Sequence, residues 1–362
     1  PWAPAGRPKE AWTRTAAHML QRASLSFIDV REKRSQVALP QPSANPDDDE
    51  DEETRQRLLV DFFEAVKEGE EEDMEELIEA GAEVDSRDGS GRTALMKAAH
   101  ADHGSLVEKL LELGASPTLR DIGGSDALLW ACLSGCSEAV EALVDAGAEL
   151  DGADHTGVTP LIRAAGCGHS SVVWWLYDRG ADGSRCDERG SDAVAAALAA
   201  GHGDIAASLV DAGAPCGLRS ACALGKLAKV EALLDEQGGG RSVNEAEPVS
   251  GVTPLMMSAA EGHDDVLALL LGRGADPNAV DREGAPALLW ASEFGRVSTA
   301  LKIVAGGGRL EGADDDGVTP LMRACLRGHV DLATWLLAQG AALEARITHV
   351  HARVCMRVCA CA

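Results

Sequence analysis

The sequence predicts an all-α solenoid built from helix–turn–helix units that are joined by loops resembling β-hairpins. Helix-start motifs recur, mostly 33 residues apart, and a glycine stands two residues before each one. The residues at the start positions are Thr93, Asp126, Thr159 and Asp192, then Thr253, Pro286 and Thr319. Apolar residues follow each start with helical spacing. A repeated unit of this length indicates an elongated array of stacked units.

The clearest helix start is Gly157-Val158-Thr159-Pro160-Leu161. Thr159 can accept a hydrogen bond from a free first-turn amide, and Pro160 suits the first helical position because that position needs no donor. The small pair Ala164-Ala165 then allows a second helix to approach closely. Because the glycine before the start occupies a fixed offset, we expect it to adopt positive φ in a turn.

Two further glycines divide each unit. One follows nine residues after the start and often precedes histidine, as in Gly168-His169 and Gly262-His263, where it separates two short helices. The other stands twelve residues later, usually in Gly-Ala, and ends the second helix as a left-handed cap. A 33-residue unit with these features resembles the ankyrin repeat, and the resemblance extends from residue 55 to about residue 346. It implies an all-α ankyrin-repeat solenoid.

The repeats suggest five segments. They are a poorly ordered N-terminal segment (1–45), an acidic linker (46–54), repeats 1–5 (55–215), repeats 6–9 (216–346) and an irregular tail (347–362). The first repeat is divergent and acidic, as a polar N-terminal cap should be. Seven consecutive acids, Asp47 to Glu53, predict a solvated linker because like charges repel one another. A docking tail for a basic partner is the alternative.

Repeat 6 departs from the pattern. Its helix start falls at Cys216 instead of residue 225, so the hairpin is missing, and the loop after Leu234 is longer than standard. We therefore expect softness at 214–218 and 236–250. The array also repeats itself at an offset of 160 residues: Leu128-Leu129-Trp130-Ala131 corresponds to Leu288-Leu289-Trp290-Ala291. A block duplication explains this correspondence, and selection for similar surfaces is the alternative.

Composition excludes several classes of function. A net charge of −26 argues against general nucleic-acid binding and against an anionic membrane surface, because phosphates would be repelled. Apolar runs long enough to span a membrane are absent. Cys132, Cys222 and Cys325 occupy a position that holds alanine in other repeats, which favours small buried thiols and a reducing compartment. We expect a cytoplasmic monomer, with the nucleus as the alternative location.

The two ends of the sequence carry further expectations. The chain begins with Pro1, so we expect the natural N-terminus to lie upstream. The tail composition does not resemble a capping helix, and an artefact of a simple nucleotide repeat or a truncated gene prediction is the favoured explanation. A metal site is the alternative for the tail, with His349, His351, Cys355, Cys359 and Cys361 as its ligands.

Signatures of catalysis are lacking. The sequence contains no P-loop, no Gly-x-Ser-x-Gly, no His-Glu-x-x-His and no kinase motif set. We expect the histidines of the Gly-His turns to bond backbone between repeats, as the family resemblance implies. His100, His103 and His155 lie outside those turns and stay open. The sequence predicts no enzyme, no cofactor and no resident metal.

Binding is the function that the pattern favours, because stacked repeats align their hairpin tips and first helices into one extended concave surface. The candidate partner-binding residues are Lys97, Trp130, Arg163, Trp290, Phe294, Arg323 and Arg327 on the first helices, with His155, Glu188, Arg189, Arg282 and Glu283 at the tips. Trp130 and Trp290 either anchor a partner or fill space between repeats. The basic residues either receive an acidic or phosphorylated segment or pair with acids at the tips.

The sequence therefore predicts a non-catalytic scaffold or adaptor for a protein partner of unknown identity. The alternative is the regulatory ankyrin portion of a larger enzyme or channel whose catalytic part lies outside these 362 residues. Fold does not supply the partner, since this framework recognises unrelated proteins.

Overall fold

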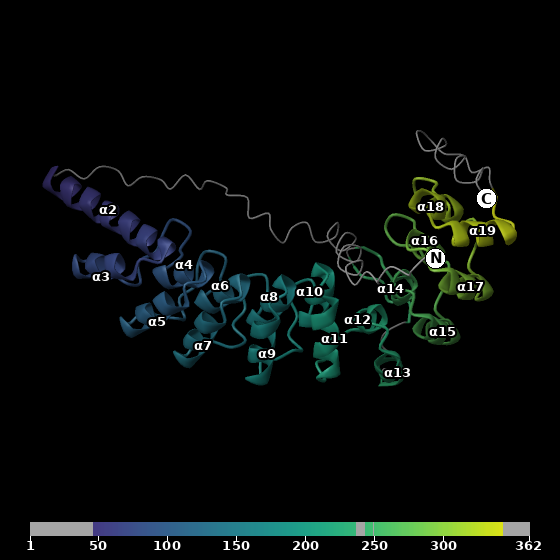
Figure 1. Cartoon of the computed structure of the whole chain (residues 1–362), viewed down its shortest axis with the longest axis horizontal. Coiled ribbons are helices and arrows are strands. Elements are labelled where there is room, and N and C mark those ends of the chain that lie inside the picture. Colours follow the sequence, from purple (N-terminus) through teal and green to yellow (C-terminus); the bar gives the residue numbers. More distant parts are fainter. Residues whose placement is uncertain (1–45, 237–242, 249, 343–362) are drawn as a thin grey trace, which may run out of the picture. The chain divides into compact units, whose positions relative to one another are not determined.

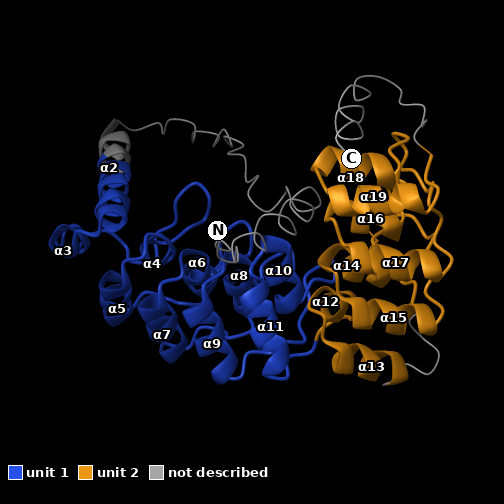
Figure 2. Ribbon diagram, turned by 45° about the vertical axis from the view of Figure 1, so that its right-hand side comes forward, with its two compact units in different colours: residues 1–215 blue, residues 216–362 orange. Residues whose placement is uncertain are grey.

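A computed structural model describes residues 46–236, 243–248 and 250–342. The chain divides into two compact units, unit 1 up to Pro215 and unit 2 from Cys216 onward (Figure 2). The division falls where the sequence lacks a hairpin. The expectations for 1–45, for the tail 347–362 and for most of the loop after Glu236 lie outside the described residues.

Unit 1 stacks paired helices in chain order (Figure 1). The pairs are α2 Pro46–Glu68 with α3 Glu71–Glu79, α4 Ala94–His100 with α5 Gly104–Glu112, α6 Ala127–Ser134 with α7 Ser137–Asp145, α8 Pro160–Cys167 with α9 Ser170–Asp178, and α10 Ala193–Ala200 with α11 Gly203–Asp211. The first helices α4, α6, α8 and α10 contact one another in sequence, and the second helices α5, α7 and α9 form a parallel row.

Unit 2 repeats this arrangement. Its pairs are α12 Leu218–Ala223 with α13 Leu227–Glu236, α14 Pro254–Glu261 with α15 Asp264–Gly272, α16 Ala287–Glu293 with α17 Val297–Ala305, and α18 Pro320–Arg327 with α19 Val330–Ala338. The first helices again contact one another in order, and so do the second helices. Strands are absent from the described residues, where two isolated bridges, Arg87 to Thr93 and Val280 to Pro286, mark the hairpin loops. The predicted all-α solenoid class is confirmed.

The predicted helix starts are N-caps. The hydroxyl of Thr159 accepts a hydrogen bond from the Ile162 amide at 3.3 Å, and Asp126 accepts one from Leu129 at 3.0 Å. The turn glycine before this start, Gly157, has φ of +80°, a conformation that a side chain would strain. Sequence-encoded caps therefore fix where each first helix begins.

The core consists of small and aliphatic side chains between the two helix rows. Ala98 and Ala99 are fully buried, so neighbouring first helices can approach closely. Cys132, Cys222 and Cys325 are buried, as their alanine-like position predicts, and none of the three forms a disulfide. Burial raises the pKa of the Cys222 thiol to about 12, which keeps it protonated and inert.

The fold bears on two irregular segments of the sequence. The acidic stretch 46–54, expected to be a linker, is helical and begins α2. Proline suits the first turn of a helix, where an N–H is not needed. The second segment is the connection to repeat 6. It comprises only residues 212–217, whereas residues 179–192 connect α9 to α10, so the hairpin is missing as the sequence indicated.

Candidate interaction surface

One aspartate in each regular hairpin organises the surface of its repeat. Its Oδ1 atom accepts backbone amides two and four residues ahead, as in Asp281, which accepts Glu283 N at 2.9 Å and Ala285 N at 2.8 Å. In five of these hairpins the Oδ2 atom also accepts a side-chain donor nine residues ahead, one turn into the first helix, whereas the residue nine ahead of Asp187 is Ala196. The pairs are Asp88–Lys97, Asp121–Trp130, Asp154–Arg163, Asp281–Trp290 and Asp314–Arg323. Each of these candidate residues is therefore tied to its own hairpin.

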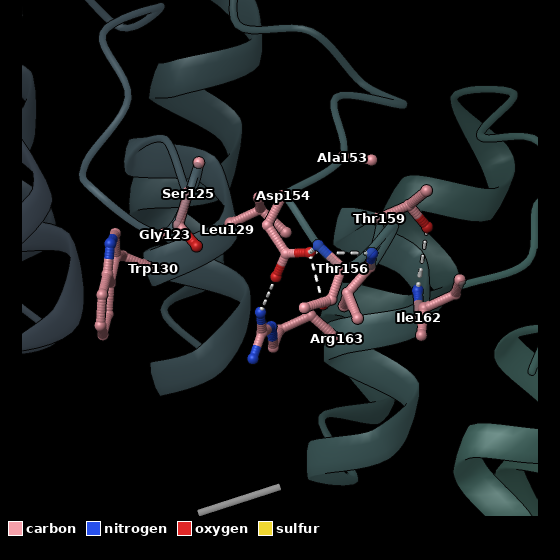
Figure 3. A network of polar contacts seen from close by, with 12 residues as sticks. Gly123, Ser125, Leu129, Trp130, Ala153, Asp154, Thr156, Thr159, Ile162 and Arg163 are labelled. Atoms are coloured by element: carbon pink, nitrogen blue, oxygen red, sulfur yellow. Dashed lines mark hydrogen bonds and ion pairs between the residues drawn. The ribbon is translucent and has the colours of Figure 1, made fainter. Parts of the chain in front are cut away.

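Arg163 illustrates the consequence for the basic residues (Figure 3). Its Nη2 atom lies 2.7 Å from Asp154 Oδ2, and the Asp154 side chain is only 7% exposed. The same carboxylate also accepts Thr156 Oγ1 at 2.7 Å. Figure 3 shows the Arg163 guanidinium turned toward this carboxylate, with Trp130 on the preceding first helix. Pairing with acids of the hairpin, one of the two interpretations of Arg163, is what the structure shows.

The basic residues of unit 2 form a larger network. Arg323 donates to Asp314 at 2.7 Å and lies 3.5 Å from Glu293, while Arg327 pairs with the other oxygen of Glu293. The Glu293 side chain is only 6% exposed, and Glu293 stands at the end of the preceding first helix, α16. Its carboxylate therefore neutralises two of the four basic candidates on the first helices.

Trp130 is covered by the preceding repeat. The Arg92 guanidinium lies 4.0 Å from the centre of its ring, and the His100 ring packs against it at 5.0 Å. Burial, followed by the charge of Arg92, lowers the pKa of His100. Lys97, in addition to its ion pair, lies 4.4 Å from the Phe63 ring. For Trp130 the structure matches the interpretation that it fills space between repeats.

Trp290 occupies the position in unit 2 that Trp130 occupies in unit 1. Its Nε1 atom donates to Asp281 at 3.0 Å, and its ring is half-buried. Phe294 follows one turn later at the end of α16 and is also half-buried. Trp290 and Phe294 thus stand one turn apart on α16, which packs against α18, the helix that carries Arg323 and Arg327.

The tip candidates are exposed and are held through their backbone. His155 N donates to Gly123 O at 3.0 Å, Glu188 N to Thr156 O at 2.9 Å, and Arg282 N to Ser250 O at 3.0 Å. Glu283 O accepts the amide of the following tip at 2.9 Å. The Arg282 guanidinium also donates to Pro248 O, and Arg189 has a partner of its own. Adjacent tips are joined in this way within each unit, while their side chains vary.

Three of the four histidines of the Gly-His turns, His169, His263 and His329, bond backbone of the preceding repeat, whereas His202 makes no such hydrogen bond among the described residues. His169 Nε2 lies 3.1 Å from Leu133 O and His263 Nε2 lies 2.9 Å from Ala223 O, in the preceding repeat in each case. His103, which the sequence left open, makes the same contact with Lys67 O at 3.0 Å. Asp102 takes the glycine position before it with φ of +63°, which aspartate tolerates better than most residues. Because position 102 holds aspartate and not glycine, the sequence did not show that His103 corresponds to the turn histidines.

Two surface residues that hold candidate residues in place, Glu293 and Arg92, were not singled out from the sequence. Glu261, which the sequence places next to its Gly-His turn as it does Phe294, lies at the end of α14. Burial raises the pKa of Glu261, and Arg296 opposes that shift. One signal in the sequence could have revealed the hairpin pairs: an aspartate recurs nine residues before the first-helix residue that it holds, as in Asp154 and Arg163.

Searches of the described part of the chain give two negative results. Groups of three or more residues able to hold a metal ion were not found there. Of the helices in that part, none combines the length and the apolar character that crossing a bilayer requires.

Comparison with known families identifies the repeats. A family model described as "Ankyrin repeats (3 copies)" matches residues 62–154, 196–281, 218–308 and 255–347, and one described as "Ankyrin repeat" matches 156–188. The chain therefore belongs to the ankyrin repeat family, whose repeats are generally protein-interaction modules.

Individual relatives resemble only part of the chain. Tyrosine-protein kinase HTK16 of Hydra vulgaris is 30% identical over 131 residues, 36% of this chain and 17% of that protein. Protein fem-1 homolog A-like of Mus musculus is 33% identical over 89 residues, 25% of this chain and 14% of the relative. Ankyrin repeat and KH domain-containing protein mask-1 of Caenorhabditis elegans is 29% identical over 116 residues, 32% and 4% respectively. The chain thus covers less than a fifth of each of these three relatives.

Proposed function

We propose that this chain is a non-catalytic scaffold or adaptor that binds a protein partner through its hairpin tips and first helices. The observation that carries the proposal is the hairpin pairing: Asp281 fixes Trp290 and Asp314 fixes Arg323 in half-buried positions on this surface. Large side chains that are held rigid before binding lose little entropy on association. Such residues are typical binding hot spots.

Interactor recovery from cells with matched variants tests this function. The full chain is compared with Trp290→Ala, on a first helix, and with Leu301→Ala, on the second helix α17, where Leu301 is 45% exposed. We expect Trp290→Ala to lose specific interactors and Leu301→Ala to retain them. If all three proteins fold equally and recover the same set, the proposed surface is wrong.

A second candidate function is regulation within a larger enzyme or channel. The observation that favours it is the match to a tyrosine-protein kinase of which this chain covers 17%. Sequencing of full-length transcripts separates the two candidates: an in-frame catalytic or membrane segment beyond either end would favour the regulatory role, and its absence favours the adaptor.

The remaining properties are proposed on physical grounds. The net charge of −26 disfavours nucleic acid and anionic membranes as partners. Free buried thiols such as Cys132 suit a reducing cytoplasm or nucleus. We also propose a monomer, which light scattering would test.

A further inference from the structure

The two units contain the same tryptophan in two different surroundings. At an offset of 160 residues, Trp130 corresponds to Trp290 and its hydrogen-bond acceptor Asp121 to Asp281. The indole hydrogen bonds are 3.1 Å and 3.0 Å long. Unit 1 therefore shows what a ring in this position accepts as a neighbour.

In unit 1 the neighbour is a guanidinium. Arg92, which immediately precedes the cap Thr93, lies 4.0 Å from the Trp130 ring centre, and His100 packs against the same ring. A cation over an indole face is attracted by the ring quadrupole, most strongly where water is excluded.

Unit 2 lacks both neighbours. The residues at the corresponding positions are Val252, before the cap Thr253, and Ala260. Valine and alanine carry no charge and have fewer atoms, so the guanidinium found in unit 1 has no counterpart beside Trp290. Cation–π contacts with Trp290 are also absent among the described residues.

Unit 2 has a carboxylate that unit 1 does not have. Glu261 replaces Ala101, one residue beyond the position from which His100 reaches the tryptophan. Glu261 is half-buried, and within the described ranges neither a hydrogen bond nor an ion pair within 4.0 Å reaches its carboxylate. The positive charge that acts on the Glu261 carboxylate is that of Arg296, whose Nε atom already donates to Ala260 O at 3.1 Å. A partly desolvated carboxylate without a partner attracts a cation.

The basic residues nearby cannot supply that cation. Arg323 and Arg327 are engaged by Asp314 and Glu293 on the other side of α16. The charge without a partner, one residue beyond the position that corresponds to His100, is thus negative, which favours a basic occupant over an acidic one.

We propose that Trp290 and Glu261 bind an arginine side chain of the partner protein, which takes the place over Trp290 that Arg92 takes over Trp130. The indole face receives the guanidinium plane, Glu261 is its counter-ion, and Phe294 flanks the site from the next turn of α16. This assignment rests on the proposed protein-binding function and specifies the chemistry of the partner.

A peptide titration tests the assignment on the full chain. The probe is the capped pentapeptide Gly-Gly-Arg-Gly-Gly, and the control carries citrulline, which has the same shape without the charge. Indole N–H signals of the tryptophans are followed by NMR, with each signal assigned by single Trp→Phe variants. We expect the arginine peptide to shift the Trp290 signal, and the citrulline peptide to bind about tenfold more weakly.

Three variants give the site its controls. Val252→Arg copies the arrangement of unit 1 and should block the arginine peptide from Trp290. Glu261→Gln, which keeps the shape of the side chain, should weaken binding about tenfold without affecting the fold. Trp130→Phe should leave the Trp290 response unchanged.

The outcomes separate this inference from the function on which it rests. No shift with arginine, an equal shift with citrulline, or a larger shift with Gly-Gly-Glu-Gly-Gly overturns the arginine site. If Trp290→Ala still loses interactors from cells in that case, the scaffold function stands and only the partner chemistry is wrong. If the peptide binds but Trp290→Ala retains every interactor, the arginine site stands and the proposed binding surface fails.

Discussion

In five hairpins a single carboxylate holds both the loop and the surface residue of its repeat. Asp154 accepts amides of its own turn with one oxygen and the Arg163 guanidinium with the other. Hydrogen bonds to charged groups contribute more to stability than neutral ones. The identity of the surface donor can change among lysine, tryptophan and arginine because the carboxylate accepts from each of them.

Removal of Glu293 tests the network of unit 2. Glu293→Ala should lower the free energy of unfolding by about 2 kcal/mol, because Arg323 and Arg327 lose a buried partner. The effect should fall below that of a fully buried pair because the Arg327 side chain is 54% exposed. Glu283→Ala, an exposed tip carboxylate in the same unit, is the control for thermal melting. Equal melting temperatures for the two variants would contradict the network.

Acidification should destabilise the His263 contact. Burial lowers the pKa of His263 below its ordinary value of 6.5, although its hydrogen bond to Ala223 O opposes the shift. The unfolded chain therefore binds a proton more readily, so the contribution to stability is present above pH 6.5 and is lost as pH falls through the folded pKa.

The chain itself offers the control for this pH dependence. Arg296 stands at the position of the turn histidine in the next repeat and donates through Nε to Ala260 O. In His263→Arg the donor remains and the titration disappears, so melting should change less between pH 7 and pH 5 than in the wild type. A wild-type profile as flat as that of the variant would refute the assignment.

At the scale of the helix, caps define the first helix of each repeat. Thr159→Ala should lower stability by about 1 kcal/mol, because the Ile162 amide loses its acceptor in a buried position. Thr118→Ala, in an exposed loop of unit 1, should change stability by less than about 0.5 kcal/mol. Chemical denaturation of both variants measures the difference.

We expect the helix pair of repeat 6 to be the least stable of unit 2. α12 has six residues, and its N-cap, Gly217, makes no side-chain hydrogen bond, whereas α14 has eight residues and is capped by Thr253. Amide hydrogens of α12 and α13 should exchange faster than those of α14 and α15. Uniform protection across unit 2 would show that the missing hairpin has no energetic cost.

Sequence reasoning succeeded where the cause was local. The caps, the positive-φ glycine before Thr159 and the turn histidine at position 169 each follow from a few neighbouring residues. The sequence did not decide whether the first-helix residues pair with hairpin aspartates, because a contact over nine residues depends on the fold of the loop. The linker expected at 46–54 stays a prediction, because the structure shows that these residues begin α2 and not what they connect.

At the scale of the whole molecule, charge is the dominant property. The net charge of −26 is concentrated in places such as α3, whose first turn holds Glu71, Glu72 and Asp73. A hydrogen bond with Asp73, together with repulsion between the two carboxylates, raises the pKa of Glu70. A folded chain with this much like charge is destabilised by self-repulsion.

Salt should therefore stabilise the protein. Raising potassium chloride from about 20 mM to about 300 mM shortens the screening length and should raise the melting temperature by several degrees. Ion pairs such as Lys109–Glu75 would weaken at the same time, but exposed pairs contribute little. A melting temperature that falls with salt would mean that the ion pairs outweigh the repulsion.

Because of the hairpin pairing, a repeat can be exchanged for another together with the residue that holds its surface side chain. Asp281 and Trp290 lie nine residues apart in one repeat, and the Arg282–Ser250 bond between neighbouring tips uses backbone atoms alone. A segment such as 279–311 carries the support for its own surface residue, so a designer could exchange it with segment 119–151 without rebuilding that support. Recombination between repeats could diversify the binding face in the same way, one surface residue at a time.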